Sequence, residues 1–245
     1  MEQNLSKKTR TESDLIGSRE VPESALYGVQ TLRGIENFRI SKFHLNEYPL
    51  FIQALAITKM GAAVANRELD LLTEEQADAI LKACKEILEG KHHDQFPVDM
   101  IQGGAGTTTN MNANEVIANR ALELMGHQRG EYQYCSPNDH VNRSQSTNDA
   151  YPTAIHIGLY YTHLKLVKHF EVLIESFRKK ATEFAHVIKM GRTQLEDAVP
   201  MTLGQTFNGF ASILRHEVKN LDFAAQDFLT VNMGATAVSY THLRA

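Results

Sequence analysis

Two long stretches near the end of the chain carry apolar residues at the spacing of one helix face, and they constrain the fold more than any other feature. The first runs without an internal proline through residues 155–187, and the second follows Pro200 and runs through residues 207–229. This spacing indicates amphipathic helices, and the first stretch exceeds the usual helix length of about 8 to 20 residues. Two such helices cannot bury both apolar faces alone, so we expect a bundle completed by further sequence or by partner subunits. Residues 191–199 are expected to form the loop between them.

A shorter helix is predicted together with both of its ends. Thr73 suits an N-cap, and Gln76 three residues later completes a capping-box pattern. Apolar residues continue at helical spacing to Leu88, and Gly90 provides a stop signal. The sequence therefore predicts a helix between Thr73 and Gly90.

Two more helices and few strands are expected in the first part of the chain. Residues 50–69 are rich in Ala and Met with an apolar face, and residues 112–125 form a further helical segment that Gly126 ends. A short hairpin is expected within residues 21–40. The sequence thus predicts an all-α fold: a mainly helical N-terminal domain over residues 1–142, followed by the first part of a central helical bundle over residues 143–237.

Composition excludes several classes of protein. The chain has 25 Lys and Arg against 29 Asp and Glu, so it lacks the basic surplus that binds nucleic acid or an anionic membrane. Its longest apolar stretches, such as residues 51–57, are far shorter than the ~20 residues of a membrane span, and residues 1–13 lack the apolar core of a signal peptide. Cys84 and Cys135 predict neither a disulfide framework nor a cysteine-based zinc site. We expect a cytoplasmic protein without nucleic-acid or membrane partners.

A glycine-rich segment, residues 102–110 (QGGAGTTTN), lies just ahead of a predicted helix. Glycines let backbone N–H groups turn toward one point, and hydroxyls beside a helix N-terminus favour a bound anion. The segment lacks the Gly-Lys pair of a phosphate-binding loop and the spacing of a dinucleotide fingerprint, so a nucleotide is not favoured. The alternative is a flexible turn whose threonines only cap the next helix.

A second polar segment, residues 145–152 (QSTNDAYP), precedes the first long stretch. Pro152 suits the first turn of a helix and Asn148 or Asp149 suits its N-cap, so capping accounts for one or two of the four consecutive hydrogen-bonding side chains but not for all. Residues 137–142 (PNDHVN) add a further polar group just before it. A structural role explains the histidine of that group more readily than a catalytic one.

A third polar loop, residues 190–202 (MGRTQLEDAVPMT), leads into the second long stretch. Three such loops in an acidic protein are typical of a site that recognises a small carboxylate through neutral donors and helix dipoles. The alternative is three independent capping loops that share no ligand.

These loops resemble the signatures of the aspartase/fumarase superfamily, in the order in which that family has them. The resemblance runs from about Leu15 to Ala237. It is carried by GGAGT ahead of NMN at residues 103–112 and by residues 19–22, 27–33, 137–142, 145–152 and 191–205. Fumarases of the superfamily typically have His where Gln194 stands and a Ser-Ser-Asn-Asp string where this chain has residues 146–149. The chain is therefore more similar to the aspartase branch.

The resemblance implies a carbon–nitrogen lyase that reversibly eliminates ammonia from L-aspartate to give fumarate. Removing a proton from the carbon next to a carboxylate yields a doubly charged aci-carboxylate, so such a site needs fixed donors for the developing charge. The residues that the resemblance assigns to the substrate carboxylates and amino group are Thr107, Ser146, Thr147 and Asn148, with Thr193 as a further contact and Gln194 lining the site.

No cofactor or metal is expected. The chain has no Ala-Ser-Gly tripeptide that could cyclise to an electrophilic group, and no metal-ligand spacing beyond the weak HHD of residues 92–94. A reaction that needs only hydrogen-bond donors and a base fits this composition.

The chain departs from the family pattern at its end. Residues 238–245 (VSYTHLRA) do not continue the family's bundle, and we expect them to be a cloning or assembly scar. The family's GSSxMPxKxNP loop carries the serine base and a carboxylate-binding lysine, and no Gly-Ser-Ser occurs in this sequence. We therefore expect the N-terminal half of a family subunit, with no catalytic base of its own and negligible turnover alone. The family's architecture implies a homotetrameric parent whose sites each combine three subunits.

Two other interpretations stay open. A fumarate hydratase would use the same dicarboxylate donors with a different leaving group, and activity on malate rather than aspartate would identify it. A non-catalytic helical protein would bind a small dicarboxylate or only assemble with other chains.

Overall fold

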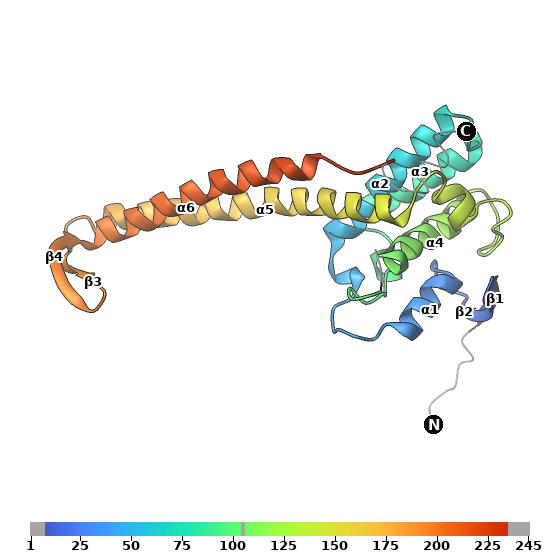
Figure 1. Cartoon of the computed structure of the whole chain (residues 1–245), viewed down its shortest axis with the longest axis horizontal. Helices are drawn as coiled ribbons and strands as arrows, with labels where there is room; N and C mark the ends of the chain where they lie inside the picture. The colour runs from blue at the N-terminus through green and yellow to red at the C-terminus, as the bar shows by residue number, and fades with distance from the viewer. Residues whose placement is uncertain (1–7, 104–105, 235–245) are drawn as a thin grey trace, which may run out of the picture. The chain divides into compact units, whose positions relative to one another are not determined.

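The computed structural model describes residues 8–103 and 106–234 (Figure 1). These residues divide into two compact units, one formed by the chain up to Gly158 with a short segment from Val231, the other by Leu159–Thr230. Helices dominate both units, which confirms the all-α class with a minor hairpin near the N-terminus. The domain boundary expected after residue 142 stays a prediction. The expected tail, residues 238–245, lies outside the described residues.

Three helices form the core of the first unit: α2 (Pro49–Glu68), α3 (Glu74–Leu88) and α4 (Thr107–Leu124). α3 packs against both α2 and α4 (Figure 1). Each helix contributes fully buried apolar side chains, among them Leu55, Ile80 and Ile117. Removal of this apolar surface from water is the main favourable contribution to folding. α2 confirms the helix expected over residues 50–69.

The ends of α3 follow the sequence signals. The backbone N–H of Gln76 donates to the Thr73 hydroxyl, and the Gln76 side chain accepts from the Thr73 N–H, both at 3.2 Å. Gly90 has a φ of +88°, a conformation that residues with a side chain rarely adopt. The predicted helix between Thr73 and Gly90 is confirmed.

α4 begins at Thr107, earlier than the expected start at residue 112. Gly106 is its N-cap with a φ of +81°, so the chain enters the helix directly from a left-handed glycine. The threonines of the glycine-rich segment therefore lie inside the first turn and do not cap it from outside. Polar side chains are buried along much of the helix: Asn110, Asn112, Asn114, Glu115 and Asn119.

The hairpin near the N-terminus pairs β1 (Thr9–Asp14) with antiparallel β2 (Gly17–Pro22). Its expected position near residues 21–40 is wrong, because the hairpin ends at Pro22 and the later segment contains the helix α1 (Val29–Asn37). Short helical turns lie between the longer elements: η1 (Leu45–Glu47), η2 (His93–Gln95) and the π-helical η3 (Pro137–Val141).

A distant carboxylate explains why α1 is a helix. Glu115 of α4 accepts the backbone N–H groups of Gly28, Gln30 and Thr31 at 2.8 to 3.0 Å. A helix N-terminus leaves such donors without intrahelical partners. The contact joins residues far apart in the sequence, so the local pattern does not reveal it.

The second unit is a pair of helices joined by a hairpin (Figure 1). α5 (Thr147–Glu183) starts in the first unit and continues through the second, where α6 (Leu203–Ala225) and η4 (Gln226–Leu229) return along it. β3 (Ile188–Thr193) and β4 (Glu196–Thr202) pair between the two helices. The loop expected over residues 191–199 is therefore wrong, since these residues form most of a hairpin with a register shift between Met190 and Arg192.

Aromatic packing and a histidine–carboxylate contact hold α5 against α6. Phe177 of α5 contacts Phe207 and Phe210 of α6, with ring centroids 6.0 and 5.6 Å apart. His163 of α5 lies 2.9 Å from the carboxylate of Asp222 of α6. Much apolar surface stays exposed in this unit, as expected for two helices alone. None of the helices in the described part of the chain is long and apolar enough to cross a membrane.

Candidate functional site

Four of the six predicted substrate-binding residues lie in the first unit, at the starts of two helices. Thr107 is the first residue of α4, Thr147 and Asn148 are the first two of α5, and Ser146 directly precedes them. Thr107 and Asn148 are exposed, whereas Ser146 and Thr147 are half-buried. Helix N-termini direct N–H groups and positive partial charge outward, which suits a carboxylate.

Capping at the start of α5 uses only part of the polar segment. The Ser146 N–H donates to the Asp149 carboxylate at 3.0 Å, and the Asn148 N–H donates to the Ser146 hydroxyl at 3.2 Å. Pro152, expected in the first turn, lies further into the helix. Because proline has no N–H, the Asn148 carbonyl loses its intrahelical donor, and the Asn232 side chain donates to it instead at 2.8 Å. The hydroxyl of Thr147 has no part in the cap.

A buried lysine lies next to this segment. Lys59 of α2 has no solvent exposure, and its Nζ donates to the side-chain oxygens of Asn110, Asn142 and Gln145 at 2.8, 2.9 and 2.9 Å. An ammonium group has three N–H bonds, which matches the three amide acceptors. Burial lowers the pKa of Lys59 to about 7.

Sequence reasoning missed Lys59, although a signal exists. Lys59 is four residues from both Leu55 and Ala63, so it lies on the apolar face of α2. Lysine is almost never fully buried unless its charge is paired. A lysine at such a position therefore predicts polar partners inside the core.

Asn110 connects this lysine to a predicted site residue. Its Nδ2 donates to the Thr147 hydroxyl at 3.3 Å and to Asn142 Oδ1 at 3.1 Å. Asn114 donates to the same oxygen of Asn142 at 3.2 Å. The result is a continuous hydrogen-bonded cluster that extends from the core to the start of α5.

The glycine-rich segment is fixed at both of its described edges. The Thr109 N–H donates to the Gln102 side-chain oxygen at 3.0 Å, so Thr109 holds the segment and does not face a ligand. Asp99, just before the segment, accepts hydrogen bonds from the Ile40, Ser41 and Ile101 backbone N–H groups at 2.7 to 2.8 Å. Burial alone would raise the pKa of Asp99, but these hydrogen bonds outweigh it and hold the pKa well below its usual range. Residues 104–105 lie outside the described part of the chain.

The other two predicted residues belong to the second unit. Thr193 ends β3, and Gln194 lies in the turn before β4 with a φ of +53°. Both side chains are exposed. Next to them Arg192 and Asp197 form an exposed ion pair at 3.0 Å. The structure places the four residues of the first unit at the starts of α4 and α5, which Asn110 of α4 links through the Thr147 hydroxyl. It relates Thr193 and Gln194 only to the hairpin.

The histidines singled out by the sequence have structural partners. The Ser136 N–H donates to Nδ1 of His140 at 2.7 Å, and burial lowers the pKa of that imidazole. His92 lies 2.8 Å from the Glu86 carboxylate, and His93 contacts the Ile87 carbonyl at 2.9 Å. Among the residues that the structure describes, no three His, Cys, Asp or Glu side chains are grouped to hold a metal ion.

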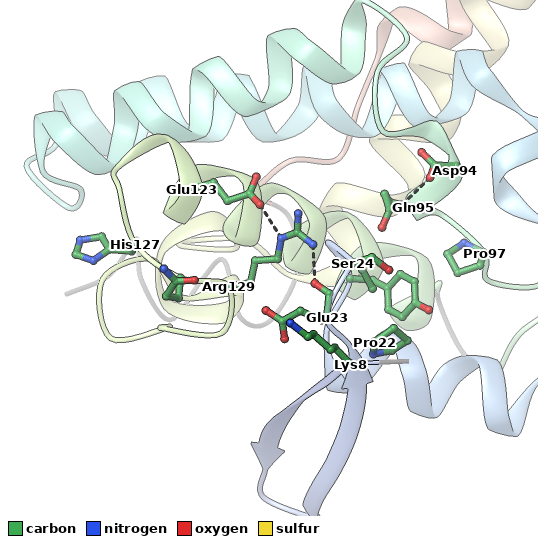
Figure 2. A pocket seen from close by; sticks show the side chains of 13 residues that line it. Lys8, Pro22, Glu23, Ser24, Asp94, Gln95, Pro97, Glu123, His127 and Arg129 are labelled. Atoms are coloured by element: carbon green, nitrogen blue, oxygen red, sulfur yellow. Dashed lines mark hydrogen bonds and ion pairs between the residues drawn. The ribbon is translucent and has the colours of Figure 1, made fainter. Parts of the chain in front are cut away.

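A cavity of about 870 Å³ lies away from the predicted residues, none of which lines it (Figure 2). Arg129, one of the basic side chains that line it, is already paired. Arg129 lies 2.6 Å from the Glu123 carboxylate and donates to the Glu23 carbonyl at 2.8 Å. Because Arg129 is already paired with an acid, it is less available to a dicarboxylate than an unpaired basic group.

Comparison with known proteins identifies relatives along nearly the whole chain. A family model described as "Lyase" matches residues 17–245. The chain is 56% identical over 235 residues to aspartate ammonia-lyase of Escherichia coli (strain K12), covering 96% of this chain and 49% of that protein. It is 55% identical to aspartate ammonia-lyase of Helicobacter pylori (strain J99), covering 94% and 49%. The chain thus spans about half the length of these relatives.

Two solved structures share the fold. A structure described as fumarate lyase:delta crystallin from Brucella melitensis in native form superimposes with a TM-score of 0.91 at 50% identity, covering 95% of this chain and 54% of that one. Recombinant class II fumarase from Schistosoma mansoni superimposes with a TM-score of 0.86 at 36% identity, covering 94% and 48%.

Proposed function

Because the chain belongs to the lyase family whose model matches residues 17–245, we propose that the protein carrying it is an aspartate ammonia-lyase, which converts L-aspartate reversibly to fumarate and ammonia. The observation that carries the proposal is the 55–56% identity to two named aspartate ammonia-lyases across almost the whole chain, against 36% to a class II fumarase. Gln194, where fumarases of the superfamily typically have His, supports the same choice.

The chemistry of the elimination fits the donors at the helix starts. Loss of the proton next to a carboxylate places a second negative charge on that group, and fixed donors stabilise it most because they need no reorganisation. We assign Thr107, Ser146, Thr147 and Asn148 to the substrate carboxylates and amino group. Thr193 and Gln194 of the β3–β4 turn are proposed to complete the substrate contacts.

The proton-abstracting base is not assigned to any residue of this sequence. The serine that the family uses lies in a Gly-Ser-Ser loop, and this sequence contains no Gly-Ser-Ser. We therefore propose that these 245 residues supply substrate-binding groups and that the base comes from the rest of the protein. The purified chain is expected to turn over aspartate negligibly, and clear activity from it alone would show that the base lies within it.

Assembly is part of the proposal. We propose a cytoplasmic homotetramer in which helices of other subunits cover the exposed apolar side chains of the second unit, such as Val172, Ile213 and Phe223. Two helices present too few faces to bury these side chains between themselves. A bundle shared between subunits would cover them.

The experiment that tests the function is a fumarate absorbance assay on the full-length protein encoded by the source DNA, with L-aspartate and L-malate offered separately. Fumarate formation from aspartate with none from malate is the expected result. Formation from malate alone would identify a fumarate hydratase, and formation from neither would favour a non-catalytic protein. Sequencing the DNA beyond the codon for Ala237 comes first, because a continuing frame with Gly-Ser-Ser supplies the expected base.

A further inference from the structure

We propose that Lys59 is a positioning residue: it orients the Asn110 amide so that the Thr147 hydroxyl is left to donate its hydrogen bond to a substrate carboxylate. The inference rests on the proposed function, since it concerns the same substrate site. Lys59 is fully buried on α2 and does not itself reach the start of α5 as a donor to Thr147.

Lys59 decides which way the Asn110 amide is oriented. A primary amide has one acceptor end and one donor end, and the group that faces each end decides its orientation. In its ammonium form Lys59 Nζ has donors and no acceptor, so the Asn110 oxygen faces it, and the contact is 2.8 Å. The Asn110 Nδ2 is thereby directed to Asn142 and Thr147.

The orientation of the Asn110 amide decides whether the Thr147 hydroxyl accepts or donates. Thr147 Oγ1 accepts from Asn110 Nδ2 at 3.3 Å, so its own proton is not used in that contact. A hydroxyl that accepts from one side can donate on the other. Thr147 is half-exposed at the first residue of α5, so a donor there lies beside a helix N-terminus, which favours an anion. If the Asn110 amide were reversed, its oxygen would accept a hydrogen bond from the Thr147 hydroxyl. That hydroxyl could then no longer donate to a substrate carboxylate.

Lys59 also fixes the two amides next to Asn110. Asn142 Oδ1 and Gln145 Oε1 are also held by Lys59, at 2.9 Å each, and Gln145 directly precedes Ser146. The Gln145 Nε2 donates to the Val141 carbonyl at 3.0 Å, so its orientation is fixed at both ends. One ammonium group therefore orients three amides, and only one of them contacts a predicted site residue.

The test is a double-mutant cycle on the full-length protein with Lys59→Met and Thr147→Val. Lys59→Met keeps the length and apolar character of the side chain but removes every donor. Thr147→Val is expected to lower kcat/KM for aspartate by on the order of 10²- to 10³-fold, the scale of losing an oxyanion donor. Lys59→Met is expected to lower it by on the order of 10- to 100-fold, the scale of a misplaced contact. The double variant is expected to be no worse than Thr147→Val alone, because the lysine acts through that hydroxyl.

Controls separate positioning from folding. Thr58→Val is the matched control, because Thr58 is buried beside Lys59 and its hydroxyl bonds only the Ala54 carbonyl of its own helix at 2.9 Å. It is expected to change the melting temperature without changing kcat/KM. If Lys59→Met yields no folded protein, Asn110→Leu, nearly isosteric with asparagine, replaces it in the same cycle.

Additive losses in the cycle, or full activity of Lys59→Met, would overturn the proposal. Fumarate affinity, measured by calorimetry on the same variants, separates the proposed reaction from the proposed role of Lys59. If the wild-type protein binds fumarate but does not act on aspartate, the proposed reaction fails while coupled losses of affinity still support the role of Lys59. A wild-type protein that binds no dicarboxylate would overturn both.

Discussion

The Thr147 hydroxyl does not share the capping role of its neighbours. The cap of α5 is made by Ser146 and Asp149, and Asn110 donates to the Thr147 oxygen. The Thr147 hydroxyl therefore adds little to the helix start but carries a donor at a position that suits a carboxylate. Function and stability should respond differently when it is removed.

In the full-length enzyme, Thr147→Ala and Asn148→Ala are each expected to lower kcat/KM for aspartate by on the order of 10²- to 10³-fold, the scale of losing an oxyanion donor. Their melting temperatures should stay near that of the wild type. Steady-state kinetics and thermal unfolding on the same preparations check both parts. Thr153→Val is the matched control, because the Thr153 hydroxyl is buried without a hydrogen-bond partner among the described residues. Unchanged kinetics with a lowered melting temperature would favour the capping interpretation.

Single residues also show which parts of the site the sequence alone does not predict. The polar segments and their order predict a carboxylate site, and Thr107, Thr147 and Asn148 lie at the starts of α4 and α5. Their contact with a carboxylate stays a prediction. Lys59 was missed because its three partners come from α4 and from the segment before α5, and such contacts exist only in the folded chain. Local patterns identify exposed groups more readily than the buried groups that orient them.

Among the helices, those whose ends are marked by neighbouring residues could be predicted from the sequence. A helix whose start depends on residues far away in the sequence could not. α3 carries its own cap and its own stop glycine, so both of its ends follow from neighbouring residues. α1 depends on the Glu115 carboxylate of α4, and its segment was mistaken for a hairpin. The β3–β4 hairpin was mistaken for a loop, because its strands are short and mostly exposed and give no alternating apolar pattern.

The contact between α3 and α4 predicts how the first unit responds to acid. Arg120 of α4 donates to both carboxylate oxygens of Glu86 of α3 at 2.6 and 2.8 Å, and these hydrogen bonds lower the pKa of Glu86 from its ordinary value of 4.5 to about 2. A carboxyl group with a lowered pKa in the fold stabilises the protein above its ordinary pKa, and that contribution is lost as the pH falls toward the folded value. Glu86 should therefore stabilise the fold fully at neutral pH and lose its contribution between about pH 4.5 and pH 2.

The variant Glu86→Gln is expected to unfold more readily at pH 7 and to lose less of its stability than the wild type between those two pH values. Urea unfolding followed by circular dichroism at a series of pH values measures this difference. Glu89→Gln is the matched control on the same side of the unit, because Glu89 pairs only with the exposed Lys91 and such pairs contribute little. Equal acid sensitivity of Glu86→Gln and the wild type would contradict the expected role of the Arg120 contact.

At the scale of the whole molecule, the second unit is incomplete by itself. Its two helices pack a row of phenylalanines between them, yet Val172, Ile213 and Phe223 are each more than half exposed. Exposed apolar patches of this kind mark interaction sites, because covering them removes apolar surface from water. The amphipathic pattern in the sequence already required this outcome, since two apolar stripes cannot both be buried by one partner helix.

We expect other subunits to cover the exposed apolar side chains of the second unit. In the full-length protein, Phe223→Glu on α6 is expected to shift the assembly from tetramer toward smaller species, because a carboxylate cannot be buried in an apolar interface without a partner. Sedimentation velocity at several concentrations measures the shift. Glu217→Lys on the same helix is the control, since Glu217 is exposed and polar already, and it should leave the assembly unchanged. An unaltered tetramer with Phe223→Glu would place the subunit interface elsewhere, and a monomeric wild type would contradict assembly through this unit.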